Sequence, residues 1–234
     1  MTVTGVGLIQ PIKHRASGSA TFSPDQIVGL QGWYDSSDAS TFSYSSGVDV
    51  SQWRDKSGNN RHFAQATVSD QPDRNGTQNG LTTVNFLLDG LLSTFVKARP
   101  ITMFVVQKWA SHADFHYTIT GGIIFMTNSV PGRYHVHGGS NWHISSDPSG
   151  PYDDMNYHTH TIYLDTVNTS HRRNGVLLRA PENVGTNGID NLNFGHGVQT
   201  VNLYLAEVIV YDSIIVGDNL TNSEAYLKNK WGTP

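Results

Sequence analysis

The feature that most restricts the fold of this chain is a series of short apolar segments, each followed by turn residues. Residues 101–106 and 203–211 are rich in the β-branched and aromatic types that strands favour. Asn174-Gly175 lies between two strand-like segments and is a strong signal for a two-residue hairpin turn. The charged fraction is 15% and the hydrophobic fraction 37%, because turn-forming Gly, Ser, Thr, Asn and Asp fill much of the chain. The pattern predicts an all-β sandwich or barrel.

The individual segments indicate different positions in the sheets. Residues 101–106 and 121–126 are apolar on both faces, which is typical of central strands. Residues 159–165 alternate between apolar and polar side chains, as half-buried strands do. Residues 203–211 form the longest predicted strand.

One helix is predicted, at the C-terminus. Thr221 and Glu224 have the spacing of a capping box, which favours a helix start at that point. Lys228 and Lys230 suit the negative end of the helix dipole, and Gly232 suits the C-cap region.

The chain divides into an N-terminal arm, residues 1–26, and one β domain, residues 27–234. The arm is rich in glycine and small polar residues and shows no amphipathic period. It carries one basic cluster, Lys13, His14 and Arg15. We expect the arm to dock on an acidic protein lattice.

Charge and composition exclude several classes of function. The formal net charge is −4 and no run of Lys and Arg is dense enough to follow a phosphate backbone, so we expect no nucleic-acid partner. The chain has no cysteine for disulfides or thiolate metal sites. No segment reaches the length of a membrane span, and no secretory signal is recognisable. Release by lysis, as for a virus particle, fits a protein that works outside cells without such a signal.

Three stretches carry a family signature when they are taken in order. They are residues 29–41 (GLQGWYDSSDAST), residues 50–62 (VSQWRDKSGNNRH), and residues 206–212 (AEVIVYD) followed by residues 226–232 (YLKNKWG). Together they resemble concanavalin A-like lectin/glucanase domains, of the laminin-G-like type found in phage and bacterial surface and virion proteins. The resemblance implies a two-sheet antiparallel jelly-roll sandwich with a short C-terminal helix.

Within these stretches, four residues have expected structural roles: Trp33, Trp53, Glu207 and Trp231. We expect Trp33 to pack inside the sandwich and Trp231 to dock the helix against a sheet. Tyr34 departs from the apolar residue that the family has after this tryptophan.

Glycosidase chemistry is not favoured. Some enzymes with this fold cleave glucans with two carboxylates on one strand. The chain has three glutamates, Glu182, Glu207 and Glu224, and none belongs to such a strand motif. Adjacent Asp153 and Asp154 would point to opposite strand faces.

Glu207 leaves two interpretations open. Strand periodicity places it on the same face as Leu203, Leu205 and Ile209. A carboxylate on an apolar face is either a tuned acid or a hydrogen-bonded structural group. The resemblance favours the structural role, because the family carries this glutamate in non-enzymes too.

One group of side chains offers the hard oxygens that a structural Ca²⁺ prefers: Asp35, Asp38, Asp55 and Asn59. Capping of turns explains each of these residues as well. We predict no other cofactor.

Histidine is frequent, with 11 in the chain. His135 and His137, like His158 and His160, place two imidazoles on one strand face, and His143 is a further candidate. The spacing is compatible with metal ligation, but no carboxylate supports it, and a solvent-facing or subunit-interface role is equally open.

The middle of the chain supplies aromatic and amide side chains of the kind that bind sugars. They are Trp109, Tyr134, His137, Asn141, Trp142 and Tyr152. Packing on neighbouring loops or at a subunit interface is the alternative.

The leading functional hypothesis is a non-enzymatic virion structural protein, such as a capsid decoration or head fibre. It would form a homo-oligomer on the particle surface and attach to a capsid or other virion protein through its arm. The alternative is a glycan-binding adhesin or receptor-binding module, and a glycoside hydrolase ranks below both.

Overall fold

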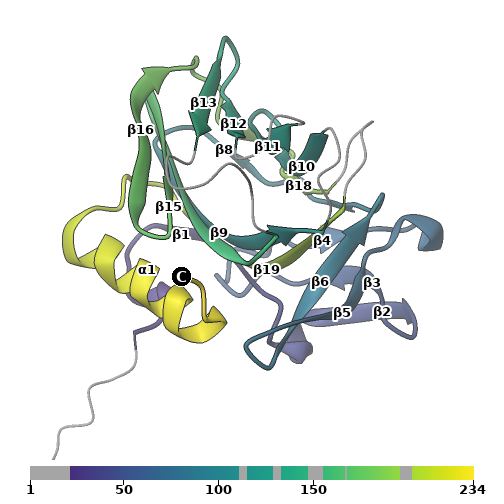
Figure 1. Ribbon diagram of the computed structural model, residues 1–234. Coiled ribbons are helices and arrows are strands. Elements are labelled where there is room, and N and C mark those ends of the chain that lie inside the picture. The colour runs from purple at the N-terminus through teal and green to yellow at the C-terminus, as the bar shows by residue number, and fades with distance from the viewer. Residues whose placement is uncertain (1–21, 111–114, 129–132, 147–154, 167, 196–201) are drawn as a thin grey trace, which may run out of the picture.

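The computed structural model describes residues 22–110, 115–128, 133–146, 155–166, 168–195 and 202–234. Antiparallel strands dominate these residues and form two facing layers, and helix α1 (Gly217–Trp231) covers the outside of one layer (Figure 1). The predicted all-β sandwich with a C-terminal helix is therefore confirmed. No helix among the described residues is long and apolar enough to cross a bilayer.

The first sheet has two long central strands, each paired along most of its length. From one edge to the other its strands are β16 (Val176–Asn183), β15 (Asn168–Arg173), β14 (His158–Asp165), β9 (Ile101–Trp109), β19 (Asn202–Tyr211), then β1 (Leu30–Asp35) and β6 (Leu81–Leu87) side by side along β19, and β5 (Asp73–Gln78).

The second sheet faces the first across the main core. Its strands, in order, are β13 (Trp142–Ser146), β12 (Arg133–His137), β11 (Ile124–Asn128), β10 (Phe115–Thr120), β18 (Asn193–Phe194), β7 (Leu91–Leu92), β4 (Phe63–Ala64), β3 (Asp49–Trp53) and β2 (Phe42–Ser46).

Short elements complete the described chain. They are the strand pair β8 (Val96–Lys97) and β17 (Ile189–Asp190), and the 3₁₀ helices η1 (Pro24–Gln26), η2 (Ala39–Thr41) and η3 (Val68–Asp70).

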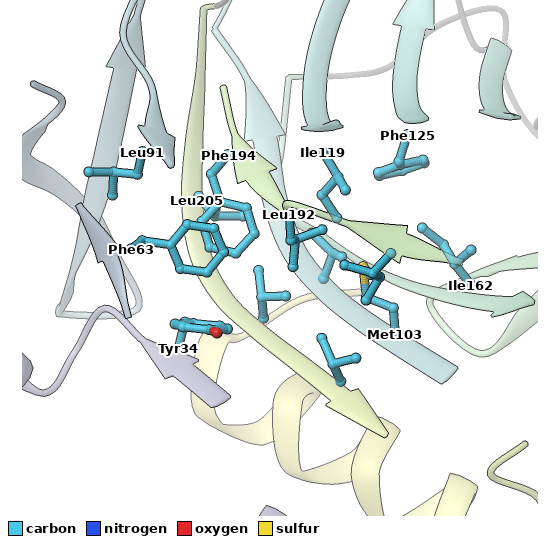
Figure 2. Close-up of a cluster of buried hydrophobic side chains, with 14 of the residues drawn as sticks. Tyr34, Phe63, Leu91, Met103, Ile119, Phe125, Ile162, Leu192, Phe194 and Leu205 are labelled. Carbon is cyan, nitrogen blue, oxygen red and sulfur yellow. The ribbon is translucent and has the colours of Figure 1, made fainter. Parts of the chain in front are cut away.

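The central strands are apolar on both faces because both faces are buried. Met103 and Val105 of β9 point into the core between the sheets, whereas Phe104 and Val106 point toward α1. Figure 2 shows Met103 among side chains from both sheets in the inter-sheet core. The strands predicted at residues 101–106, 159–165 and 203–211 are confirmed, but β14 is buried on both faces up to Leu164 and is not half buried. Of residues 121–126, only the part from Ile124 onward forms a strand.

The hairpin predicted at Asn174-Gly175 is present. Both residues have positive φ, 48° and 79°, which is the backbone form that a type I′ turn requires. The turn joins β15 to β16 with Arg173 opposite Val176.

The helix begins earlier than the capping box predicts. Val216 occupies the N-cap, and Thr221 already lies inside the helix, where its Oγ1 donates to the Gly217 carbonyl. Glu224 does not cap: it accepts hydrogen bonds from Arg172 and Thr161 instead. The capping-box interpretation is therefore wrong, because Thr221 bonds to a carbonyl within the helix and Glu224 bonds to β14 and β15.

The end of the helix follows the prediction. Gly232 adopts the left-handed conformation at the C-cap (φ 63°), and its N–H donates to the Lys228 carbonyl at 2.8 Å.

A bulge in β19 changes which residues share a face. The register of β19 against β9 shifts between Leu205 and Glu207. Leu203 and Leu205 therefore face the inter-sheet core, while Glu207 lies with Ile209 on the face under α1. The prediction that Glu207 shares a face with Leu203 and Leu205 is wrong, and its link to Ile209 is confirmed.

The segment that precedes β1 is attached to the domain. Ser23 stands at the N-cap of η1, and its side chain makes no capping bond. Phe22 packs edge-on against Tyr226 of α1 with ring centroids 5.8 Å apart, and Tyr211 donates to the Pro24 carbonyl at 2.9 Å.

Candidate functional site

An exposed aromatic side chain lies at the tip of the β12–β13 hairpin. His137 and Trp142 are opposite each other in the register, and their rings lie 4.7 Å apart. Trp142 is 37% exposed, and Asn141 beside it in the turn is also exposed. Burial lowers the pKa of His137, so this ring is neutral at pH 7. The tip therefore presents a neutral aromatic surface next to an amide.

The tip is held in place by Arg99, which lies between β8 and β9. Its Nε donates to the Asn187 carbonyl at 2.6 Å, and its terminal nitrogens donate to the carbonyls of Thr166 and Gly138 at 3.3 and 3.5 Å. Ser140 N–H donates to the Val184 carbonyl at 2.8 Å. Arg99 thus ties three loops together and fixes the position of the hairpin tip.

Glycine makes this close contact feasible. A Cβ on Gly138 would lie 2.0 Å from the Arg99 guanidinium, and one on Gly139 would lie 2.6 Å from the Asn187 side chain. Gly139 also has a φ of 113°, a conformation that L side chains rarely adopt. A larger residue at either position would push the tip away.

A polar pocket of about 320 Å³ adjoins the tip. Asn187 is shared between the two, since it lines the pocket while its N–H donates to the Gly138 carbonyl. Lys97 and Asp190 bring one charge of each sign to the lining, and Lys97 pairs with Asp212 at 3.0 Å. The site therefore combines a rim, formed by His137, Asn141 and Trp142 at the hairpin tip, with a pocket whose charged groups are of both signs.

The structure brings together three of the six predicted glycan contacts, namely His137, Asn141 and Trp142. Trp109 and Tyr134 are only 2% and 0% exposed and lie in the inter-sheet core, so their rings cannot stack on a ligand. Their strand phase explains this, because each shares the inward face with other core residues of its strand. Tyr152 lies outside the described residues, as does the basic cluster Lys13, His14 and Arg15.

Glu207 is buried under α1 and is saturated with donors. Trp33 Nε1 and the Tyr226 hydroxyl donate to one oxygen at 2.7 and 2.9 Å. Lys230 Nζ and Trp231 Nε1 donate to the other, both at 2.7 Å. Burial raises the pKa of Glu207, and Lys230 opposes that rise. A carboxylate with four donors and no exposed surface anchors the helix and is not available to a substrate.

The residues weighed as a calcium site do not fit that role. Lys56 Nζ lies 3.0 Å from Asp35 and 2.9 Å from Asp38, where a bound cation would have to be. Asp55 accepts from the backbone N–H groups of Trp33 and Ser57. Burial acts to raise the pKa of Asp35, but Lys230, Ser37 and Lys56 together bring it below its ordinary value.

The Asn59 side chain is held by β1, because its Nδ2 donates to the Leu30 carbonyl at 3.0 Å. An ammonium group and backbone amides thus take the positions that Ca²⁺ would need.

The tryptophans with expected structural roles divide between two layers. Trp53 is fully buried in the inter-sheet core, and Trp231 is fully buried between α1 and the first sheet. Trp33 is only half buried and lies on the helix side, where Lys56 Nζ is 4.4 Å from its ring centre. Tyr34 fills the inter-sheet position instead, so the expected inward packing of Trp33 is wrong by one residue.

The histidine pairs do not form a metal centre among the described residues, where no group of three or more potential ligands converges. His158 and His160 face inward and are buried, not solvent-facing. His143 is also fully buried, 3.6 Å from Glu182.

Arg99 and Asn187 were not singled out from the sequence. Neither belongs to a motif, and their role depends on loops that are distant in the chain. His171 was missed for the same reason: its partners come from β13 and β14.

No protein-family model and no curated protein matches the sequence. Similarity is found among solved structures. Trypanosoma rangeli sialidase in complex with 2,3-difluorosialic acid has a TM-score of 0.59 at 12% identity, over 88% of this chain and 34% of that chain. The binding domain of botulinum neurotoxin DC in complex with SialylT has a TM-score of 0.62 at 12% identity, over 90% of this chain and 55% of that chain.

A mutant of the HCR D/C protein has a TM-score of 0.60 at 11% identity, over 88% of this chain and 53% of that chain. The chain thus spans about a third to about half of the length of these proteins. At such identities the likeness shows a shared β-sandwich fold.

Proposed function

We propose that this protein is a non-catalytic glycan-recognition module that binds through the tip of the β12–β13 hairpin and the adjoining polar pocket. The observation that carries the proposal is the exposed Trp142 ring, set against His137 and next to Asn141. Aromatic faces pack on the apolar faces of sugar rings, and amides bind their hydroxyls.

The pocket supports the proposal through its size and chemistry. Its volume of about 320 Å³ is at the lower end of the range for small-molecule sites. Thr186, Asn187 and Asp190 in its lining carry the neutral and charged acceptors and donors that hydroxyl groups need. Because Arg99 fixes Asn187 and Gly138 together, rim and pocket are preorganised relative to each other.

Two further points are consistent with binding without catalysis. Glu207, the carboxylate most suggestive of an acid in the sequence, is enclosed by four donors. One of the similar solved structures is described as a toxin binding domain in complex with SialylT. That likeness supports a recognition role for the fold and names no ligand for this chain.

A glycan array, followed by calorimetry on the best ligand, tests the proposal. We expect Trp142→Ala to weaken binding by roughly tenfold or more, since a central aromatic anchor typically carries on the order of 2 kcal/mol. Tyr44→Ala is the matched control, because Tyr44 is 39% exposed and lies on β2 in the opposite part of the molecule. Equal affinity of parent and Trp142→Ala, or no glycan bound at all, would refute this site.

The virion role stays a separate prediction. It depends on residues 1–21 and their basic cluster, Lys13, His14 and Arg15, which lie outside the described residues. Deletion of residues 1–20 should abolish attachment to particles and leave the thermal transition of the domain unchanged. Attachment of the truncated protein would refute the arm as the docking segment, and a monomer in sedimentation would refute the predicted homo-oligomer.

A further inference from the structure

A row of buried polar side chains crosses the core directly beneath the β12–β13 hairpin. His160 of β14 and His171 of β15 are both fully buried, with His160 Nδ1 and His171 Nε2 3.0 Å apart, so that one N–H donates to the other nitrogen. His171 Nδ1 is in turn 2.7 Å from the Ser145 hydroxyl of β13. We call His160, His171 and Ser145 the histidine row. It connects the first sheet to the hairpin of the second.

Among the described residues, the surroundings of the row are aromatic and hold no counter-charge. Trp109, Phe125 and Tyr134 each place a ring centre between 5.1 and 5.8 Å from that of His160. His160 Nε2 has no hydrogen-bond partner within the described residues. A second proton on either imidazole would therefore put a positive charge into an apolar interior.

The charged and titratable groups that face the row are nearly all cations or potential cations. β15 contributes Arg173, whose guanidinium lies over the Tyr134 ring, β14 contributes His158, and β13 contributes His143. β9 and β11 contribute the uncharged rings of Trp109 and Phe125.

Within the part of the chain that the structure describes, the carboxylate on this side of the core is Glu182 of β16. It is 3.6 Å from His143 and is paired with Arg179 at 3.0 Å, so it compensates a charge on His143 and not one on the row. Consistent with this, burial, His171, His158 and Arg173 lower the pKa of His160 well below its ordinary value.

We propose that the histidine row is an acid-sensitive latch: when its imidazoles take up protons, the β12–β13 hairpin separates from β14 and β15, and the ligand rim at its tip is dismantled. The hairpin is the element that opens because β13 pairs with β12 alone among the described strands, and because the hairpin meets the row through the Ser145 hydroxyl and the Tyr134 ring. Ligand release on acidification rests on the proposed function, whereas the latch itself does not.

Hydrogen exchange tests the latch without any ligand. Each histidine that can protonate only in the open form shifts the opening equilibrium by up to tenfold per pH unit. For two histidines with an open-form pKa near roughly 6.5, we expect exchange in residues 133–146, corrected for the intrinsic pH effect, to rise by roughly 250-fold between pH 6.5 and pH 5. Residues 30–53 should stay protected over the same range.

Variants sharpen the experiment. The double change His160→Leu and His171→Leu removes both titrating groups and should keep residues 133–146 protected at pH 5. His62→Gln is the control, since His62 lies outside the row and accepts from the Asp55 N–H through Nδ1. It should behave like the parent.

Two results would overturn the latch: pH-independent exchange of residues 133–146 in the parent, or loss of protection in residues 30–53 at the same pH. The exchange of the parent protein alone tests the latch, even if the double variant does not fold. Failure of the proposed function is seen separately, as absence of Trp142-dependent glycan binding at pH 7.

Discussion

The two ends of the sandwich are built from different kinds of core. Around β1 to β4 and β18, which we call the aromatic half, rings pack against rings: Phe63 stacks on Phe194 at 4.0 Å, and Tyr34 meets Phe63 edge-on at 4.6 Å. Around β9 and β11 to β15, which we call the histidine half, the inward residues include His160 and His171. In Figure 1, β2, β3 and β4 of the aromatic half lie on the right, and β13 and β15 of the histidine half lie on the left.

The difference teaches how stability and function are divided. The helix side of the first sheet compensates its buried charge, as the four donors on Glu207 show, and in the aromatic half Trp53 Nε1 lacks a partner among the described residues. The histidine half holds more of the buried polar atoms that lack partners in the described residues, among them both amide atoms of Gln107 and Nε2 of His160. Unsatisfied groups of this kind reduce stability, and this half carries the proposed ligand rim.

The largest expected effect comes from breaking the satisfied network. Glu207→Ala removes the acceptor of four donors and leaves the buried Trp231 N–H beside a cavity, while Lys230 keeps its ion pair with Asp35 at 2.7 Å. We expect a loss of about 3–5 kcal/mol in the free energy of unfolding, measured by urea titration. Glu207→Gln, which keeps the shape, should lose less; equal stability of the Ala variant and the parent would contradict the role of this network.

The second-largest expected effect is a pH dependence of the stability, which arises from the buried histidines of the histidine half. Burial, His143 and Arg173 lower the pKa of His171 to about 3, against roughly 6.5 in an unfolded chain. The folded protein therefore binds fewer protons than the unfolded chain in this range, so stability is complete above roughly pH 6.5 and falls as the pH drops toward 3.

At pH 5 the loss from His171 alone is about 2 kcal/mol. Urea titrations at pH 7 and pH 5 measure it, and His171→Gln should flatten the profile. Ser40 and Lys56 hold the pKa of Asp38 at about 2. The stability that Asp38 contributes is therefore lost only at a pH lower than the two values compared here. A parent protein equally stable at both pH values would contradict the prediction.

A smaller effect has the opposite sign. Gln107 is fully buried and both its amide atoms lack partners among the described residues. Gln107→Met keeps the length of the side chain and removes the unsatisfied groups, so we expect the protein to gain about 1–2 kcal/mol. Thermal unfolding measures the gain, and a clear decrease in Tm would show that Gln107 has a partner in the folded protein.

The smallest expected effect comes from Asp89, which lies between β6 and β7. Burial, together with Asp73, Asp70 and Asp49, raises the pKa of Asp89 to about 6, although the Leu87 N–H opposes the rise. The charged form is thus disfavoured in the fold, and stability gains as the pH falls from about 7 toward 4.

Asp89→Asn keeps the acceptor for Leu87 and should stabilise the protein at pH 7 by no more than about 1 kcal/mol, because the group is partly exposed. The gain should vanish at pH 4, and a gain that persists there would refute the electrostatic explanation.

The strands that periodicity predicted well are those with a uniform environment. β9 and β19 are buried on both faces, so apolar residues fill them regardless of register. The Asn174-Gly175 turn was predictable because its positive φ values restrict the residues that fit. The bulge between Leu205 and Glu207 was not, since nothing local marks it.

The candidate site was predictable only in part. His137, Asn141 and Trp142 were found because exposed aromatics and amides in loops signal binding, but the same composition also selected Trp109 and Tyr134, which are buried. Sequence alone does not separate them, because their strand phase depends on cross-strand packing.

The histidine row required the register of β14 against β15, where Asp165 faces Asn168 and His160 faces Arg173. This register brings His171 diagonal to His160. The turn that sets it has no Asn-Gly signal in the sequence, so the row could not be predicted.

The most direct test of the contrast between the halves is an NMR titration of the His160 and His171 ring protons in the intact protein. We expect neither signal to follow a protonation curve between pH 8 and pH 5.5, in contrast to a histidine in an unfolded peptide, which titrates near roughly pH 6.5. Titration of both rings with midpoints near 6.5 and no change in fold would contradict a neutral, acid-sensitive interior.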